Sequence, residues 1–557
     1  MATKWWQEAI IYQIYPKSFK DSNNDSVGDI PGITSQLDYI KSIGVNTLWL
    51  NPIFISPQVD NGYDISNYYA IDPLFGTEDQ LSEFIEEAHK RQLKIVFDLV
   101  LNHTSTQHPW FYEASKSPDN IYRDYYIWKK GRGTLPPNNW ASFFGGSVWE
   151  KDKQSDDYYF HLFDKEMPDL NWQNPEVRHA MLDIAKYWLT KGIDGFRFDA
   201  FIHLEKADFS LQVPDIPEGQ VAIAEEYYAN LPKVRDYLSA FIGELRAIKP
   251  DLFILGEAAS ANESLARQYT DPANHQCDTV VSFRYFPEEF SEITDQLPEG
   301  LQQKRLAVKE FKATMASWQA QLNGERFPTL YWNNHDMPRL VSRFGDDQKF
   351  RDESAKMLAT LMYLQRGLPI ILYGEELGMK NVVIDDVDVF QDPAAKDYFN
   401  EMLAKGMAQQ DALAVIASVN KEASRGAMQW NAEAYAGFSE VEPWSDVNIE
   451  AVYNVADQEA LSESVLHYYQ ALLALKQQPL FGEAAFELLE TGDDTYVYQR
   501  ELADQLALVA CNLSKKPVII EVPDELTGGQ VVLHGTPYVL TKNQLELPPY
   551  GAVVIIN

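Results

Sequence analysis

Short apolar runs alternate with amphipathic stretches along most of the chain, a pattern typical of parallel βα units. The amphipathic stretches predict helices, among them one ending near residue 44 and others at 78–92, 175–191 and 464–476. The apolar runs predict strands at 10–15, 45–50, 93–100, 193–198, 252–255, 279–283, 329–332 and 369–373. Eight strands that alternate with helices indicate an α/β fold of the (β/α)8 TIM-barrel type.

Two segments interrupt the alternation. Residues 104–172 follow the third strand, are rich in Trp, Tyr, Asn, Pro and Gly and show no helical period, so we expect an inserted lobe there. Residues 380–455 are predicted to be a second irregular insertion, and the tail beyond residue 480 consists of short strand-like runs. The predicted domains are a barrel (1–103 and 173–478), an inserted domain (104–172) and a C-terminal antiparallel β-domain (479–557).

The charge of the chain excludes some classes of partner. It carries 47 Lys and Arg against 82 Asp and Glu, a formal net charge of -35. Such a field repels phosphate backbones and anionic membranes, so we expect neither nucleic acid nor a membrane as partner. A neutral substrate suits this surface, although the acidic excess also serves solubility alone.

Few features point to export. The start of the chain lacks an apolar run of signal-peptide length, and no stretch approaches the roughly 20 apolar residues needed to cross a bilayer. The only two cysteines, Cys277 and Cys511, lie far apart and resemble neither a disulfide framework nor a metal site. We therefore expect a cytoplasmic protein, either a monomer or a homodimer, with no organic cofactor.

Polar clusters follow four of the expected strands. They end in His103, Asp199, Glu257 and Asp336. Barrel enzymes carry their chemistry at the carboxyl ends of the strands, and charges that converge there without a task would be costly. The pattern therefore predicts an active site built on carboxylates.

Two of these acids suggest complementary roles. Arg197 precedes Asp199 by two residues, so both side chains share one face of a strand, and we expect the guanidinium to keep that carboxylate ionised as a nucleophile. Glu257 follows an apolar run, where desolvation would raise its pKa and let it serve as a general acid. Paired carboxyls in opposite protonation states are what glycoside cleavage requires.

Five ordered motifs carry a family resemblance. DLVLNH (98–103), GFRFDA (195–200), LGEA (255–258) and NNHD (333–336) resemble the four signature regions of the α-amylase family, glycoside hydrolase family 13, and MPDLN (167–171) resembles a fifth. The opening segment and DNGYDIS (60–66) are similar to oligo-1,6-glucosidases, maltases and dextran glucosidases within it. The resemblance implies a barrel, a B domain inserted after the third strand and a C-terminal β-sandwich.

The resemblance also implies roles for single residues. Asp199 would be the nucleophile, Glu257 the acid/base and Asp336 the transition-state stabiliser. Residues that would contact the terminal glucose or line its pocket are Asp60, Tyr63, His103, Phe144, Phe163, Arg197, Ala200, His335 and Arg425. The implied activity is that of an exo-acting, retaining α-glucosidase that acts on a small oligosaccharide, with transglucosylation as a side reaction.

A loop near the start resembles a calcium site of the same relatives. Its implied ligands are Asp21, Asn23, Asp25, the Val27 carbonyl and Asp29. We therefore expect a structural Ca²⁺, with Mg²⁺ as the alternative and a solvated acidic turn as the simpler interpretation.

Departures from the family pattern concern the bond that is cleaved. Relatives that prefer α-1,6 bonds usually carry Val after the nucleophile, whereas Ala200 stands here and leaves room for an α-1,4-linked sugar. Met167 replaces the Gln usual in the α-1,6 group. We expect a preference for α-1,4 links such as maltose, and keep an α-1,6-specific glucosidase as the alternative. Weaker alternatives are trehalose-6-phosphate hydrolysis, sucrose isomerisation and an inactive binding relative.

Overall fold

The computed structural model describes residues 4–392 and 394–557, so the first three residues of the predicted barrel lie outside it. The chain divides into two compact units, each described by itself. One contains the segments Met1–Leu48, Glu87–Leu93 and Tyr285–Asn557, and we call it the C-terminal unit; the other, the central unit, contains Trp49–Glu86 and Lys94–Arg284.

The predicted strands form one parallel sheet, and the expected TIM barrel is confirmed. The strands lie in the order β11-β10-β9-β5-β2-β1-β15-β14. Every residue of β1, β9 and β15 is buried, as expected for strands covered on both faces. Their bounds are β1 (Ile11–Ile14), β2 (Thr47–Leu50), β5 (Lys94–Val100), β9 (Gly195–Asp199), β10 (Phe253–Glu257), β11 (Thr279–Val281), β14 (Thr329–Leu330) and β15 (Leu368–Leu372).

The amphipathic stretches form helices with clear local starts. Asn174 caps α5 (Pro175–Thr190) through its side chain, and Pro175 takes the first position, where no backbone donor is needed. At the start of α3 (Glu78–Lys90), the Thr77 amide donates to the Gln80 side chain at 2.8 Å, and the Gln80 amide donates to the Thr77 hydroxyl at 3.3 Å. Further helices are α1 (Ile30–Ser35), α2 (Leu37–Ile43), α7 (Pro232–Ile248), α8 (Glu263–Tyr269), α9 (Val308–Gln321), α11 (Arg351–Tyr363) and α15 (Val465–Lys476). Within the described residues, no helix combines the length and the apolar character that a membrane span needs.

The inserted segment after β5 contains a small antiparallel sheet in the order β6-β8-β7. Its strands are β6 (Trp128–Lys130), β7 (Trp149–Lys151) and β8 (Asp157–Phe160). The segment also contains a helix, although its residues show no helical period. Residues 109–116 form α4 (Pro109–Lys116), because His108 accepts a hydrogen bond from the Trp110 amide and Pro109 starts the first turn.

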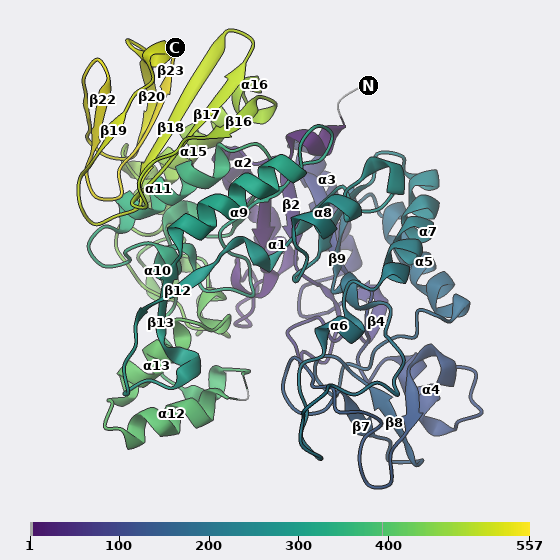
Figure 1. Cartoon of the computed structure of the whole chain (residues 1–557). Coiled ribbons are helices and arrows are strands. Elements are labelled where there is room, and N and C mark those ends of the chain that lie inside the picture. Colours follow the sequence, from purple (N-terminus) through teal and green to yellow (C-terminus); the bar gives the residue numbers. More distant parts are fainter. Residues whose placement is uncertain (1–3, 393) are drawn as a thin grey trace. The chain divides into compact units, whose positions relative to one another are not determined.

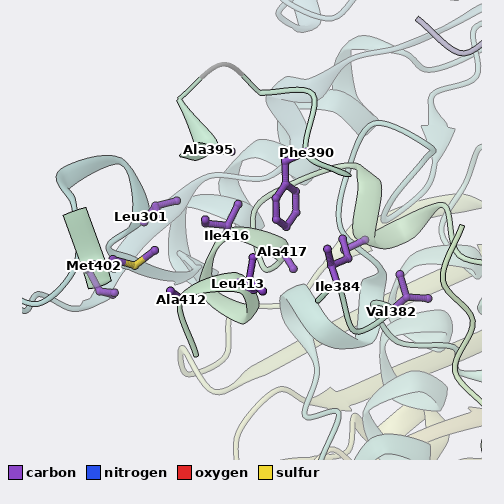
Figure 2. Packing of buried hydrophobic residues seen from close by; sticks show 12 residues of the cluster. Leu301, Val382, Ile384, Phe390, Ala395, Met402, Ala412, Leu413, Ile416 and Ala417 are labelled. Atoms are coloured by element: carbon purple, nitrogen blue, oxygen red, sulfur yellow. The ribbon is translucent and has the colours of Figure 1, made fainter. Parts of the chain in front are cut away.

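The second insertion is also more regular than expected. It contains α12 (Ala395–Ala404) and α13 (Gln409–Ala417), which Figure 1 shows in green. Figure 2 shows how Leu413 and Ile416 of α13 pack with Phe390 and with Leu301, which comes from a segment about a hundred residues earlier. Tertiary packing thus contributes to the stability of both helices.

The C-terminal strands form two antiparallel sheets, drawn in yellow-green in Figure 1. One has the order β16-β17-β18-β23-β20 and the other β19-β22-β21. Val497 and Leu508 of the first sheet share a core with Ile520 and Leu545 of the second, which confirms the predicted C-terminal antiparallel sheets. The bounds are β16 (Ala485–Leu488), β17 (Thr495–Leu502), β18 (Gln505–Asn512), β19 (Val518–Glu521), β20 (Gln530–His534), β21 (Val539–Leu540), β22 (Gln544–Leu547) and β23 (Ala552–Ile556).

Several short elements complete the two units. They are β3 (Phe54–Ile55), β4 (Asn67–Ile71) and α6 (Glu225–Tyr228) in the central unit, and β12 (Glu288–Glu292), β13 (Gln303–Leu306), α10 (Leu340–Phe344), α14 (Val455–Ala460) and α16 (Pro479–Gly482) in the C-terminal unit.

Candidate active site

Arg197 is the centre of the carboxylate cluster in the central unit. It lies on β9 with only 2% of its surface exposed, and Asp199 follows on the same face of the strand. Nη1 of Arg197 donates to Oδ1 of Asp199 at 2.8 Å, and Nη2 donates to Oε2 of Glu257. The structure therefore brings the predicted nucleophile and the predicted acid to one guanidinium.

A third carboxylate, which the sequence reasoning did not assign, completes the cluster. Asp98 on β5 is 1% exposed, and both of its oxygens accept from Nη1 of Arg197, at 2.7 and 2.9 Å. A signal for it existed: an acid stands in the middle of the otherwise apolar run IVFDLVL. One buried cation thus faces three carboxyl groups, which is too little positive charge to keep all three ionised.

Burial opposes the ionisation of Asp199 that was expected from its contact with Arg197. Burial raises the pKa of Asp98 to about 6, although Arg197 lowers it. Burial also raises the pKa of Asp199 well above its usual range, and the charge of Arg197 does not offset this because Glu257 and Asp98 lie nearby. Asp98 and Asp199 are therefore harder to ionise in the free site than their contact with Arg197 alone implies.

Tyr63 is anchored beside the cluster. Its hydroxyl donates to Oδ2 of Asp98 at 3.0 Å and accepts from Nδ2 of Asn51 at 2.8 Å. The turn before it uses backbone conformations with positive φ at Asn61 and Gly62. Asp60, at the start of this turn, is 9% exposed. The structure thus places both predicted sugar contacts on one tight turn that Asp98 holds through Tyr63.

Aromatic residues of the inserted segment meet His103. The ring of Phe163 lies 5.1 Å from the ring of His103, and Phe144 lies 5.7 Å from Phe163, measured between centroids. Burial lowers the pKa of His103 to about 4, so its imidazole is neutral at neutral pH. A neutral ring can donate one hydrogen bond and accept another, which suits contact with sugar hydroxyls.

A buried ion pair fastens the inserted segment to the strand ends. Nζ of Lys206 lies 2.7 Å from Oδ2 of Asp169 and donates to Oδ1 of Asn102 at 3.0 Å. Asp169 belongs to the MPDLN motif, and Asn102 precedes His103. The sequence reasoning did not assign Lys206, because nothing local marks a lysine seven residues beyond Asp199 as buried.

Two small residues flank the catalytic acids. Ala200 has a φ of 48°, in the left-handed region, and is 6% exposed. Gly256 precedes Glu257, and a Cβ placed on it would lie 2.5 Å from Cε1 of Phe201. The backbone beside each carboxylate therefore accepts only a limited choice of side chains.

The remaining predicted residues form a group of their own in the C-terminal unit. Arg425 is 3% exposed and donates from Nη2 to Oδ1 of Asp336 at 3.1 Å, and from Nε to the carbonyl of His335 at 2.8 Å. Nε2 of His335 lies 3.2 Å from Oδ2 of Asp336, while its Nδ1 bonds to Nε2 of Gln13 at 2.8 Å. The ring of Tyr15 stacks on His335 at 6.1 Å. Gln13 and Tyr15, from the end of β1, were not assigned by the sequence reasoning.

The loop at 21–29 has the donor chemistry that a hard cation prefers. Asp21 and Asp29 are 3% and 2% exposed, and neither forms an ion pair within the described part of the chain. Burial, together with Asp21, raises the pKa of Asp29. No group of three or more His, Cys, Asp and Glu side chains gathers in a metal-binding arrangement among residues 4–392 and 394–557. A cation would fit only with the oxygens of Asn23 and Val27 as further ligands.

Comparison with known proteins assigns the family. The family described as "Alpha amylase, catalytic domain" matches residues 13–483, and "Maltogenic Amylase, C-terminal domain" matches residues 486–554. An oligo-1,6-glucosidase of Parageobacillus thermoglucosidasius is 41% identical over 94% of this chain and 93% of its own. A glucan 1,6-alpha-glucosidase of Streptococcus dysgalactiae subsp. equisimilis is 38% identical over 100% and 99% of the two chains. A solved structure named "Family GH13_31 enzyme" is 45% identical, with a TM-score of 0.91 over 100% of both chains. The motifs, the barrel and these matches agree, and the chain belongs to the α-amylase family of glycoside hydrolases.

Proposed function

We propose that the protein is an exo-acting, retaining α-glucosidase that releases terminal glucose from short α-1,6-linked glucosides. The observation that carries the proposal is the shared guanidinium: Arg197 bonds both Asp199 and Glu257. Asp199 then attacks the anomeric carbon while Glu257 protonates the leaving oxygen. The step requires a general acid at the leaving oxygen and a carboxylate nucleophile at the anomeric carbon.

The close approach of the two carboxyl groups supports retention. Retaining glycosidases hold their carboxyls about 5 Å apart, whereas inverting enzymes leave a wider gap of roughly 6.5–9.5 Å for water. Asp199 and Glu257 each bond one nitrogen of the same guanidinium, and this shared contact favours a close pair over a wide gap. Asp199 can therefore reach the sugar directly and form a covalent glycosyl-enzyme.

The relatives favour the α-1,6 alternative over the α-1,4 preference expected from the sequence. The similar proteins carry the names oligo-1,6-glucosidase and glucan 1,6-alpha-glucosidase. Ala200 and Met167, the two departures from the α-1,6 pattern, favour maltose as a second candidate substrate. Because Ala200 stands where α-1,6 relatives usually carry Val, the α-1,6 preference proposed here must come from other residues that contact the second sugar.

Other roles stay predictions. Asp336 would stabilise the transition state, and Asp60, Tyr63, His103, Phe144, Phe163, Arg197, Ala200, His335 and Arg425 would bind the terminal glucose. The predicted domain boundaries, oligomeric state, cytoplasmic location and transglucosylation also stay predictions.

A disaccharide panel tests the linkage. We expect kcat/KM to be highest on isomaltose, lower on maltose and lowest on sucrose and trehalose-6-phosphate. Proton NMR of the first product should show α-glucose, because two displacements retain the configuration. Asp199→Asn should lower kcat by several orders of magnitude on every substrate. A β product, or maltose cleaved well ahead of isomaltose, would contradict the proposal.

We further propose that the loop at 21–29 binds Ca²⁺. A bound cation would stabilise the folded state by an amount that grows with the logarithm of its concentration above Kd, and it would offset the repulsion between Asp21 and Asp29. We expect Ca²⁺ to raise the Tm of chelator-treated protein, and Asp25→Asn, at an exposed loop position, to weaken this shift. Titration with Mg²⁺ measures selectivity. A Tm that responds to neither ion contradicts the proposal.

A further inference from the structure

Gln13 is a buried polar residue beside His335 in the C-terminal unit, and no step of the proposed reaction uses it. It lies on β1 with 0% of its surface exposed, and its carbonyl accepts from the Tyr373 amide at 2.9 Å. Its Cα pairs with that of Leu372 on β15, so the strand fixes where the side chain starts. A buried amide is costly unless it forms hydrogen bonds. Nε2 of Gln13 lies 2.8 Å from Nδ1 of His335, which makes this ring one of its partners.

The contact with Gln13 decides which nitrogen of the His335 ring carries the proton. The amide nitrogen of Gln13 can only donate, so Nδ1 accepts and the neutral ring is protonated at Nε2. Nε2 in turn lies 3.2 Å from Oδ2 of Asp336 and donates to it. In the opposite tautomer, a bare Nε2 would face a carboxylate oxygen. Turning the amide of Gln13 over would not remove that repulsion, so for a neutral ring only the Nε2–H tautomer satisfies both contacts.

Two other contacts of His335 do not distinguish its ring nitrogens. The ring of Tyr15 stacks on it with 6.1 Å between centroids and 26° between planes, which holds the plane of the imidazole. Arg425 donates from Nε to the backbone carbonyl of His335 at 2.8 Å. A doubly protonated ring would add a second buried cation beside Arg425, whose guanidinium already donates to Asp336. The contact with Gln13 at Nδ1 therefore selects the tautomer.

The selected tautomer matters for the orientation of Asp336. The side chain of Asp336 is 27% exposed, so part of it is open to a ligand. Arg425 donates to its Oδ1 at 3.1 Å, and Nε2–H of His335 donates to its Oδ2. A carboxylate held by one donor at each oxygen cannot rotate freely and keeps lone pairs for sugar hydroxyls. A group held in place before the reaction stabilises developing charge without rearrangement.

We propose that Gln13 is a positioning residue of the reaction: its amide fixes the Nε2–H tautomer of His335, and this tautomer holds Asp336 in the orientation that stabilises the transition state. The proposal rests on the proposed function, through the predicted role of Asp336. Gln13 acts through the imidazole and does not itself contact the sugar. Its loss therefore lowers kcat and leaves KM nearly unchanged.

NMR of the unmodified protein tests the tautomer independently of activity. In protein with isotope-labelled histidine, long-range proton–nitrogen spectra show which ring nitrogens carry protons, and the signals lost in His335→Gln identify this ring. We expect a proton on Nε2 and none on Nδ1. Gln13→Glu keeps the size of the side chain and offers an acceptor in place of the donor, so it should protonate Nδ1 as well. A proton on Nδ1 in the unmodified protein would overturn the proposal.

Kinetics on isomaltose test whether the tautomer matters for the reaction. Gln13→Met keeps the length of the side chain and removes the hydrogen bond, and we expect kcat to fall roughly 10- to 100-fold while KM changes less than about twofold. Gln365→Met is the matched control, since Gln365 is also 0% exposed in the same unit and donates to the Leu361 carbonyl at 3.1 Å. It should lower the Tm as much as Gln13→Met does and leave kcat unchanged.

A double-substitution cycle separates positioning from a general loss of packing. When Gln13→Met is added to His335→Gln, kcat should fall no further, because the ring through which Gln13 acts is absent. Losses that multiply, or an unchanged kcat in Gln13→Met, would overturn the proposal. Absence of α-glucoside hydrolysis in the unmodified protein would overturn the proposed function and leave the NMR result standing.

Discussion

At the scale of single residues, several buried carboxyl groups have fewer positive charges beside them than would be needed to keep all of them ionised. Asp98, Asp199 and Glu257 share one guanidinium. A second example lies in the C-terminal unit, where Glu375 is 2% exposed and accepts hydrogen bonds from the hydroxyls of Tyr363 and Tyr469. Burial raises the pKa of Glu375 to about 8. The folded protein therefore binds protons that the unfolded chain releases.

This shift predicts how stability depends on pH. Between pH of about 4.5 and 8 the folded state keeps the Glu375 proton and the unfolded state loses it, so the free energy of unfolding falls as the pH rises. Glu375→Gln removes the titration and keeps an acceptor for both tyrosines. We expect its Tm to fall less between pH 5 and pH 8 than that of the unmodified protein, as measured by calorimetry. Glu325→Gln, at an exposed position, is the control; equal slopes for all three proteins would contradict the assignment.

At the scale of elements, the strands of the barrel position the catalytic groups through close backbone packing. On β10, Gly256 lies where an added Cβ would be 2.5 Å from Cε1 of Phe201 and 2.7 Å from Sγ of Cys277. Both neighbours are buried and cannot move into solvent. The absence of a side chain at this position therefore sets where Glu257 emerges from the strand.

Gly256→Ala should accordingly damage both stability and catalysis. Overpacking of a buried site typically costs about 1–3 kcal/mol, and displacement of Glu257 should lower kcat more than it raises KM. Urea unfolding and hydrolysis rates measure the two effects. Gly243→Ala is the matched control: it lies inside α7 with no atom within 4 Å of the added Cβ, and should raise the free energy of unfolding by about 0.5–1 kcal/mol. Equal effects of both substitutions would show that packing around Gly256 does not matter.

At the scale of the whole molecule, the excess of acids dominates long-range electrostatics. With 82 acidic and 47 basic side chains, the folded chain repels itself more than the expanded unfolded chain does. Salt screens such repulsion over about 10 Å at 0.1 M. Binding of a neutral sugar involves no net charge and should not share this dependence.

Raising NaCl from low concentration to about 0.3 M should therefore increase the Tm and leave KM for isomaltose unchanged. Differential scanning calorimetry and initial rates measure the two quantities. Sucrose at equal osmolality controls for effects of solute exclusion on the Tm. A Tm that falls with salt would show that attractive ion pairs, such as Lys206–Asp169, outweigh the repulsion.

The sequence predicted features that depend on neighbouring residues, and it missed features that depend on residues distant along the chain. The strands around Asp199 and Glu257 were predictable, because apolar runs of strand length end in polar clusters within the same few residues. Helices α12 and α13 were missed, because part of their packing is with Leu297 and Leu301, about a hundred residues earlier in the chain. Lys206 was missed for the same reason, since its partner Asp169 is distant in sequence.

The sequence alone determined the order of strands and helices and the motifs that place acids at strand ends, because side-chain periodicity is a local property. Only the tertiary structure decided how Asp98 and Asp199 are buried around one guanidinium. The two acids come from separate strands, and burial raises the pKa of both despite the charge of Arg197. Desolvation depends on what surrounds a group in three dimensions, and no local pattern of residues encodes that sum.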